Sequence, residues 1–310
     1  MLSRFLKEVS SIELYGKLPI AKDYLRVGGG KGAGIALRDW IDQGFSTLVD
    51  REAPPSLAWP GRFIVSHYAG DPLMGCSWPS SDSGGLRPFP FTTFISRRRR
   101  VLTTDWGSGG ASLRPLWDQL VGVYTAHRSY SDGQSFLAAM RGKQIEIGRA
   151  APVERQRIDY GLWVNTLWPD GGVDELVRVL VSLGRLARQG WTDPIRLPLV
   201  AGLPSIPQVH AWWTALTKLE FVARGATPSV FFPLTNVDSD APHFVTFELG
   251  PLDPSKPNWL ARPTSPLGPS DHASSELRIV HEHVPPGDAT PPLSESLRGP
   301  LVSARARSGA

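Results

Sequence analysis

Ser83 is the first residue whose surroundings suggest chemistry, because Ser-Asp-Ser-Gly-Gly at 81–85 is close to the Gly-Asp-Ser-Gly-Gly around the nucleophile of serine proteases. Such a serine needs a base within hydrogen-bonding distance and an acid that orients the base. His67 is the only histidine before Ser83, and its surroundings, Val-Ser-His-Tyr-Ala-Gly, do not match those of a protease histidine. The chain before Ser83 is also too short for the double barrel of such an enzyme. We interpret the match as accidental.

The glycine-rich stretch Gly28–Gly34, Gly-Gly-Gly-Lys-Gly-Ala-Gly, suggests a phosphate-binding loop. A P-loop needs a glycine six residues before its lysine and a serine or threonine after it, and Leu25 and Gly32 occupy those positions. A loose dinucleotide fingerprint, G-x-G-x-x-[GA] with a later acid, is matched by Gly28, Gly30, Ala33 and Asp50. The preceding Ala-Lys-Asp-Tyr-Leu-Arg does not read as a buried parallel strand. We favour a flexible loop that leads into a helix, and a nucleotide-binding enzyme is kept as an alternative.

The histidines and carboxylates form no catalytic or metal-binding pattern. His127, His210, His243, His281 and His283 are scattered along the chain, and there is no H-E-x-x-H motif and no cysteine pair. We therefore expect no catalytic set, no metal and no cofactor, and a protein that is not an enzyme.

The net charge and the cysteine content limit the partners and the cellular compartment that the sequence suggests. The net charge is +4, and Arg97–Arg100 carry part of the basic surplus. A basic cluster can bind nucleic acid or an anionic membrane surface, which we keep as a second alternative, although a solvated loop is the favoured interpretation. Cys76 is the single cysteine, and no run of about 18 apolar residues is present. We expect a cytoplasmic protein with no membrane insertion and no nucleic-acid partner.

The elements that position these residues follow from periodicity. Alternating β-prone runs predict strands at 12–15, 62–68, 90–95, 229–234 and 243–249, and apolar residues at helical spacing predict helices at 35–49, 113–127, 131–141, 174–189 and 208–221. Beyond residue 250 the chain is crowded with proline, serine and glycine, which predicts disorder. The sequence thus indicates a single α/β domain over 1–250 and a mostly disordered tail over 251–310.

Three segments in a fixed order carry a more specific pattern. They are Tyr-Gly-Lys-Leu-Pro-Ile-Ala-Lys-Asp-Tyr-Leu-Arg at 15–26, Arg-Asp-Trp-Ile-Asp-Gln-Gly-Phe at 38–45 followed by Trp-Pro-Gly-Arg-Phe at 59–63, and Gly-Cys-Ser-Trp-Pro-Ser-Ser-Asp-Ser-Gly-Gly-Leu-Arg-Pro-Phe-Pro-Phe-Thr at 75–92. This order resembles the TagF/ImpM family, accessory proteins of bacterial type VI secretion. The resemblance is strongest over residues 10–130.

Family motif positions map onto Gly16, Lys17, Leu18, Pro19, Asp23, Tyr24, Arg26, Trp40, Arg62, Phe63, Pro79, Ser80, Asp82, Gly85, Arg87, Phe89 and Pro90. Two positions depart from the family pattern. Lys22 stands where members usually carry glycine, and Leu86 is an extra residue between Gly85 and Arg87.

The resemblance implies a three-layer α/β/α sandwich-like fold and a regulatory role without catalysis. Family members act as post-translational repressors and are thought to work through a cytoplasmic forkhead-associated scaffold protein. The motif residues are therefore expected to contact a protein partner, or else to stabilise the domain alone.

The residue types of the third segment suggest how its turn is built. Asp82 can accept hydrogen bonds from nearby backbone N–H groups, and its carboxylate can pair with Arg87 or with Arg26. Pro79, Pro88 and Pro90 restrict the backbone on both sides of the turn.

Overall fold

A large antiparallel sheet organises the chain, as shown by a computed structural model that describes residues 8–28, 32–49, 60–66, 71–98, 113–147, 159–188, 195–200, 203–218, 229–233, 243–248 and 252. Within these residues, eight strands pair in the order β3-β2-β6-β5-β4-β9-β10-β8. Their bounds are β2 Glu13–Gly16, β3 Leu25–Val27, β4 Gly61–Val65, β5 Leu73–Trp78, β6 Phe91–Ser96, β8 Ile195–Leu199, β9 Ser229–Pro233 and β10 His243–Glu248. Every pairing in this sheet is antiparallel. A separate two-stranded ribbon joins β1 (Glu8–Ser11) to β7 (Gln144–Ile147).

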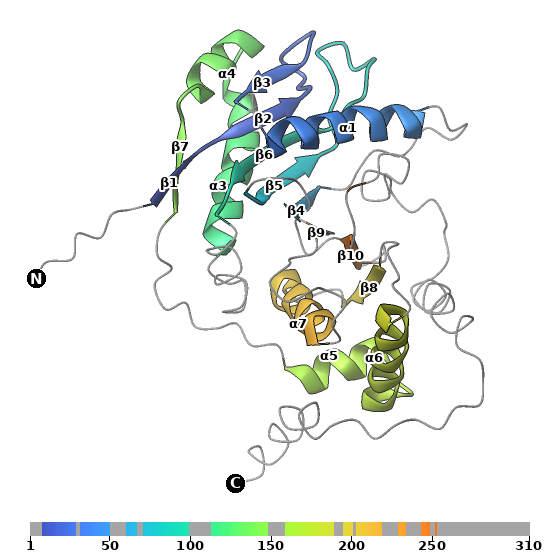
Figure 1. Cartoon of the computed structure of the whole chain (residues 1–310). Helices are drawn as coiled ribbons and strands as arrows, with labels where there is room; N and C mark the ends of the chain where they lie inside the picture. The colour runs from blue at the N-terminus through green and yellow to red at the C-terminus, as the bar shows by residue number, and fades with distance from the viewer. Residues whose placement is uncertain are drawn as a thin grey trace, which may run out of the picture.

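Helices cover both faces of this sheet (Figure 1). One face packs against α1 (Ala33–Val49), and the other packs against α3 (Arg114–Ala126) and α7 (Ser205–Lys218). A short 3-10 turn, η2 (His127–Ser129), links α3 to α4 (Gly133–Met140), which packs on the edge strand β3. The helices α5 (Tyr160–Leu167) and α6 (Gly172–Arg188) pack on each other beside α7. The predicted α/β fold with helices on both sides of a sheet is confirmed.

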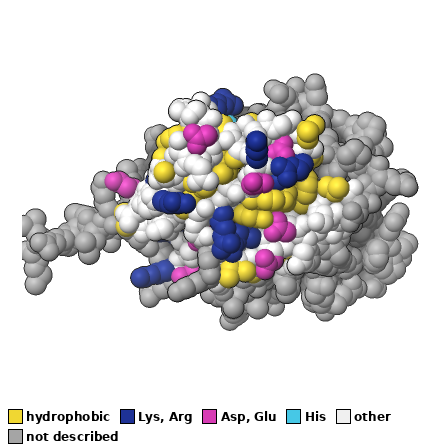
Figure 2. Space-filling model, turned by 90° about the horizontal axis from the view of Figure 1, so that it is seen from above, with side chains coloured by type: hydrophobic (Ala, Val, Ile, Leu, Met, Phe, Trp, Pro, Cys, Tyr) yellow, Lys and Arg dark blue, Asp and Glu magenta, His cyan; other side chains and the backbone are white. Residues whose placement is uncertain are grey.

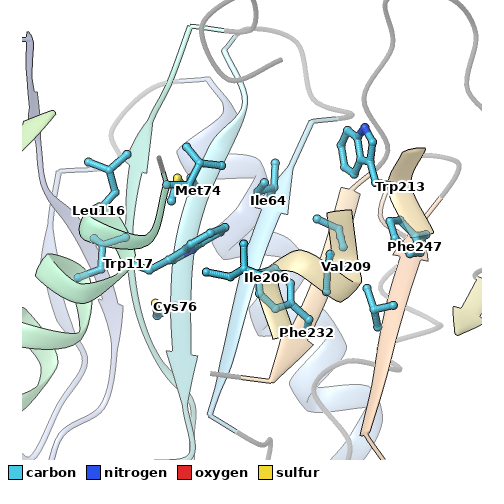
Figure 3. Packing of buried hydrophobic residues seen from close by; sticks show 14 of the residues in the cluster. Ile64, Met74, Cys76, Leu116, Trp117, Ile206, Val209, Trp213, Phe232 and Phe247 are labelled. Atoms are coloured by element: carbon cyan, nitrogen blue, oxygen red, sulfur yellow. The ribbon is translucent and has the colours of Figure 1, made fainter. Parts of the chain in front are cut away.

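Alternation along the strands explains why both faces are apolar. Phe63 in β4 and Phe231 in β9 face α1, whereas their neighbours Ile64 and Phe232 face α3 and α7. Successive strand residues point to opposite faces of a sheet. A sheet that is covered by helices on both faces therefore needs apolar residues at successive positions along each strand. Figure 3 shows the second face, where α3 and α7 residues pack over the sheet from opposite ends.

Gly75 sits at the centre of the sheet and lets large neighbours approach. A Cβ atom there would lie 2.4 Å from the Phe63 ring and 2.5 Å from the Thr93 carbonyl oxygen. On the other face, Trp117 of α3 donates its indole N–H to the Gly75 carbonyl at 3.2 Å. Because Gly75 has no side chain, Phe63 on one face of the sheet and Trp117 on the other can both approach its backbone closely.

In the C-terminal half, a buried glutamine holds the loop after β8. Gln208, fully buried in α7, accepts a hydrogen bond from the Val200 backbone N–H at 2.6 Å and from the Trp163 indole at 3.0 Å. Its amide donates to the carbonyls of Val200 at 3.1 Å and Leu203 at 3.2 Å. One neutral side chain therefore links α5, α7 and the β8–α7 loop.

The predicted elements agree with most of the structure. All ten predicted helices and strands correspond to observed ones within a few residues. The strands β1, β3, β5, β7 and β8 and the helix α5 were not predicted. The predicted tail at 251–310 lies outside the described residues, apart from Leu252. Across the described part of the chain, no helix combines the length and apolar character needed to cross a bilayer.

Candidate functional site

The two motif-bearing loops lie side by side at the edge of the sheet. The first, residues 17–24, joins β2 to β3, and the second, residues 79–90, joins β5 to β6. The backbone N–H of Ser83 donates to the Ala21 carbonyl at 2.8 Å. The Arg87 guanidinium donates from Nη2 to the Lys22 carbonyl at 2.5 Å. Segments that are 65 positions apart in sequence are therefore joined into one double loop.

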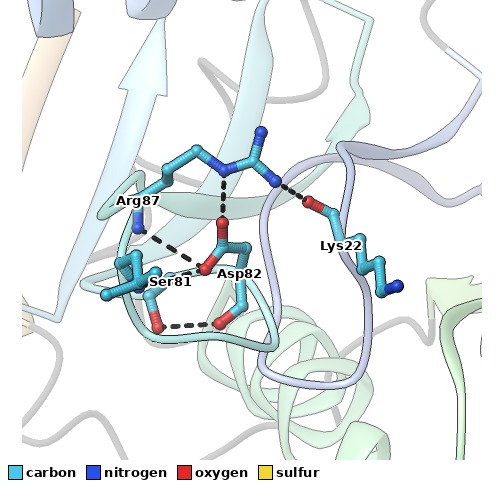
Figure 4. A network of polar contacts seen from close by, with 5 residues as sticks. Lys22, Ser81, Asp82 and Arg87 are labelled. Carbon is cyan, nitrogen blue, oxygen red and sulfur yellow. Dashed lines mark hydrogen bonds and ion pairs between the residues drawn. The ribbon is translucent and has the colours of Figure 1, made fainter.

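Asp82 is the centre of the second loop (Figure 4). Its Oδ2 accepts the Nε–H of Arg87 at 2.5 Å, and its Oδ1 accepts the backbone N–H groups of Leu86 at 3.2 Å and Arg87 at 3.4 Å. The hydrogen bond from the Arg87 side chain, followed by those from the backbone, holds the pKa of Asp82 below its ordinary value. A carboxylate that accepts hydrogen bonds on both oxygens is a weak base. The arrangement is therefore better suited to stabilising a turn than to acting as a general base.

The partner of Asp82 is Arg87, and the extra residue does not prevent the pairing. Leu86 turns its backbone N–H toward Asp82 and its side chain outward, with 85% of its surface exposed. Gly85, at φ 68°, supplies the left-handed backbone that the lengthened turn needs. The predicted capping by Asp82 is confirmed, and of the two predicted partners, Arg87 rather than Arg26 makes the ion pair.

Gly16 and Pro90 bring the bases of the two loops together. Gly16 has φ 135°, and a Cβ atom there would lie 2.0 Å from the Pro90 carbonyl oxygen. β2 and β6 pair through Gly16 and Phe91 at this point. Only glycine allows this close approach of two backbones.

Lys17 is buried beneath the double loop among aromatic rings. Its Nζ lies 4.8 Å from the centre of the Tyr24 ring and 6.0 Å from that of Phe89. Burial lowers the pKa of Lys17, and the nearby positive charge of Arg87 lowers it further. Ring faces partly compensate the buried ammonium, which fits a structural role for this motif lysine.

Tyr15 connects the double loop to α1. Its ring stacks on Tyr24 at 5.7 Å between centres, and its hydroxyl donates to Asp42 of α1 at 2.6 Å. The Arg38 guanidinium lies 5.9 Å from the Tyr15 ring centre. Burial raises the pKa values of both Tyr15 and Asp42, and the hydrogen bond to Asp42 raises that of Tyr15 further. Tyr15 was not singled out from the sequence as a site residue, although it is the first residue of the first motif segment.

The structure divides the motif residues by exposure. The buried ones are Gly16, Lys17, Leu18, Trp40, Asp82, Phe89 and Pro90. Pro79 and Ser80 are half-buried, and the exposed ones are Pro19, Asp23, Tyr24, Arg26, Gly85 and Arg87. Trp40 lies apart from the double loop and stacks on Phe231 across the sheet face under α1. Contact with a partner stays a prediction for the exposed group, while the buried group serves packing in the folded chain.

The alternative sites are not assembled in the part of the chain that the structure describes. The strand before the glycine-rich loop, β3, is a three-residue edge strand antiparallel to β2, not the parallel strand of a dinucleotide fold. Gly29, Gly30 and Lys31 lie outside the described residues. Among described residues, no cluster of three or more metal-ligating side chains is found.

The basic run 97–100 differs from the predicted solvated loop at its first residue. Arg97 is 4% exposed, and its backbone N–H donates to the Pro72 carbonyl at 2.8 Å. Arg98 is exposed, and the last two arginines lie outside the described residues. The run therefore begins as a continuation of the β5–β6 pairing, which is why its first side chain is buried.

Comparisons with known proteins add a structural likeness. No protein-family model matches the chain, and no curated protein matches it in sequence. Among solved structures, the chain is similar to PA0076 from Pseudomonas aeruginosa PAO1, with 15% sequence identity and a TM-score of 0.42. That match covers 91% of this chain and 100% of the other.

Proposed function

We propose that this protein is a non-catalytic accessory protein of bacterial type VI secretion. In this proposal it belongs to the TagF/ImpM family and represses secretion after translation by binding a cytoplasmic forkhead-associated scaffold protein. The proposal originates in the order and content of the motif segments at 15–26, 38–63 and 75–92.

One observation supports it beyond the sequence. The first and third motif segments, which are far apart in the chain, form one double loop fixed by Arg87, whose side chain bonds both Asp82 and the Lys22 carbonyl. Motif residues that jointly build a rigid surface loop fit a binding role, because loops held by a rigid scaffold often carry recognition.

Deleting the gene in its own bacterium tests the function. We expect increased secretion of the system's tube protein in the deletion strain, measured by immunoblotting of culture supernatants, and restoration of low secretion by the wild-type gene on a plasmid. Overexpression in the parent strain should lower secretion further. If secretion is unchanged in both the deletion and the overexpression strain, the repressor proposal is wrong.

A binding measurement tests the partner separately. The purified full-length chain should bind the purified forkhead-associated scaffold from the same organism in isothermal titration calorimetry. A thermal-shift panel with NAD and ATP serves as a control, since a clear stabilisation by either would favour the nucleotide-binding alternative instead.

A further inference from the structure

We propose that Lys22, Tyr24, Arg26, Leu86 and Arg87 form a docking surface that binds an acidic partner surface with an apolar pocket for the Leu86 side chain. These five residues, called the double-loop surface below, are all exposed. The inference rests on the proposed function for the identity of the partner, and it adds the place and the chemistry of binding.

The residues of the double-loop surface come from two loops and an edge strand that are bonded to each other. Arg87 holds the Lys22 carbonyl, and Ser83 holds that of Ala21. The Tyr24 ring of the first loop lies 4.8 Å, centre to centre, from the ring of Phe89, two residues after Arg87 in the second loop. Arg26 lies opposite Tyr15 in the β2–β3 pairing, and the Tyr15 ring stacks on Tyr24.

The apolar part of the double-loop surface consists of Leu86 and Tyr24. Leu86 is 85% exposed and Tyr24 is 47% exposed. Single exposed apolar residues are common on protein surfaces, but here the backbone N–H of Leu86 is held by Asp82, and the Tyr24 ring contacts Tyr15 and Phe89. The backbone of Leu86 and the ring of Tyr24 are already fixed and lose little conformational entropy on binding, which favours the two residues as anchors.

Its charge indicates the chemistry of the partner. Lys22, Arg26 and Arg87 are exposed cations, whereas Asp23 is the exposed carboxylate in the same loops and Asp82 is buried and paired. Figure 2 shows the molecule from above, with basic and acidic side chains interspersed around exposed hydrophobic surface. A partner that supplies carboxylates around an apolar pocket complements this pattern.

The experiment compares two surface variants with two matched controls, using the full-length chain and the purified forkhead-associated scaffold. Leu86→Asp should weaken binding by about 30-fold or more, because it removes the apolar anchor and adds a charge of the wrong sign. Lys22→Glu should weaken it by about 5- to 10-fold, with a smaller effect at high salt. Neither side chain is part of the Asp82 network, so both variants should unfold like the wild type.

The controls have the same chemistry elsewhere on the molecule. Leu162→Asp changes a leucine that is 55% exposed on α5, and Lys218→Glu changes an exposed lysine at the end of α7. Both should bind within about 2-fold of the wild type.

The possible results separate this inference from the function on which it rests. If the wild type binds and Leu86→Asp and Lys22→Glu bind equally well, the double-loop surface is wrong while the proposed function stands. If the controls weaken binding as much as the two variants, the surface is also wrong. If the wild type does not bind the scaffold, the proposed partner is wrong. The assignment of that partner to the double-loop surface is then wrong as well.

Discussion

Two loops of this protein are each held by one buried polar side chain, and the two side chains differ in charge while the two loops differ in exposure. Asp82 holds the 82–87 turn at the surface with an ionised carboxylate and an arginine. Gln208 holds the 200–203 loop in the interior with a neutral amide. Both side chains satisfy backbone groups that have no partner in a helix or strand, which such groups require where water does not reach them.

The difference shows what each loop can be used for. A neutral amide can be fully buried without a charge, so the Gln208 loop can be built into the core. A carboxylate that binds an arginine keeps that arginine at the surface, where its 57% exposed side chain can meet another molecule. The buried loop therefore serves stability, and the surface loop combines a fixed backbone with exposed recognition groups.

The largest expected effect concerns the backbone under the surface loop. Gly16→Ala should destabilise the protein by roughly 4 kcal/mol, because the new Cβ would meet the Pro90 carbonyl and the residue would keep a positive φ. Gly142→Ala is the matched control, since Gly142 also has a positive φ (74°) but a Cβ atom added to it would meet nothing within 4 Å. It should cost roughly 1 kcal/mol.

Urea unfolding followed by circular dichroism measures both variants. Equal losses for Gly16→Ala and Gly142→Ala would show that backbone conformation alone matters, and that the close approach of Gly16 to Pro90 does not hold the loops together.

The next largest effect is expected from removing the amide that holds the buried 200–203 loop. Gln208→Leu should cost about 3 kcal/mol of unfolding free energy, because the Val200 N–H group and the Trp163 indole lose the amide oxygen that accepts their hydrogen bonds inside the core. Gln134→Leu, at an exposed position of α4, should change stability by less than about 0.5 kcal/mol. A loss in Gln208→Leu as small as that in Gln134→Leu would contradict the role assigned to the buried amide.

The smallest effect distinguishes the two loops by pH. The pKa of Asp82 is lowered in the folded chain, so its contribution to stability is present above its ordinary value of 3.8 and is lost as pH falls below it. Asp82→Asn should therefore lose stability at pH 7 and show a shallower decline between pH 5 and pH 3 than the wild type. Gln208→Leu should keep the wild-type slope, because an amide does not titrate. Parallel slopes for Asp82→Asn and the wild type in urea titrations would contradict this.

The sequence predicted long periodic elements better than strands buried on both faces. The helix α6 carries Leu176, Val179 and Leu183 on one face, and the last two are nearly fully buried. The strand β5, Leu-Met-Gly-Cys-Ser-Trp, is buried at every position and shows no alternation, so no periodic pattern marks it in the sequence. β8 contains Pro198, which argues against a strand unless it lies at a sheet edge, as it does here.

At the candidate site, local geometry was more predictable than exposure. An aspartate followed by glycines and an arginine predicted the capped turn, because those interactions span only five residues. The burial of Lys17 depends on rings from two loops that are distant in sequence, and no local pattern contains that information. The exposure of Leu86 follows from the same packing, although an apolar residue inserted in a polar turn is a signal that can be read in the sequence.

The order of strands in the sheet has a consequence for synthesis of the chain. The central strand β4 pairs with β9, and just beyond it the Ser66 N–H donates to the Ser229 hydroxyl, a contact that spans 163 positions. At ribosomal rates of about 5–20 residues per second, synthesis of the chain from β4 to β9 takes roughly 8–30 s, and β4 lacks this pairing strand until then. During that time, Phe63 and Ile64 lie on an unpaired edge of a nascent polypeptide. Chaperone binding and aggregation on the ribosome should therefore concentrate on β4, and chain truncations before residue 229 should be the most prone to both.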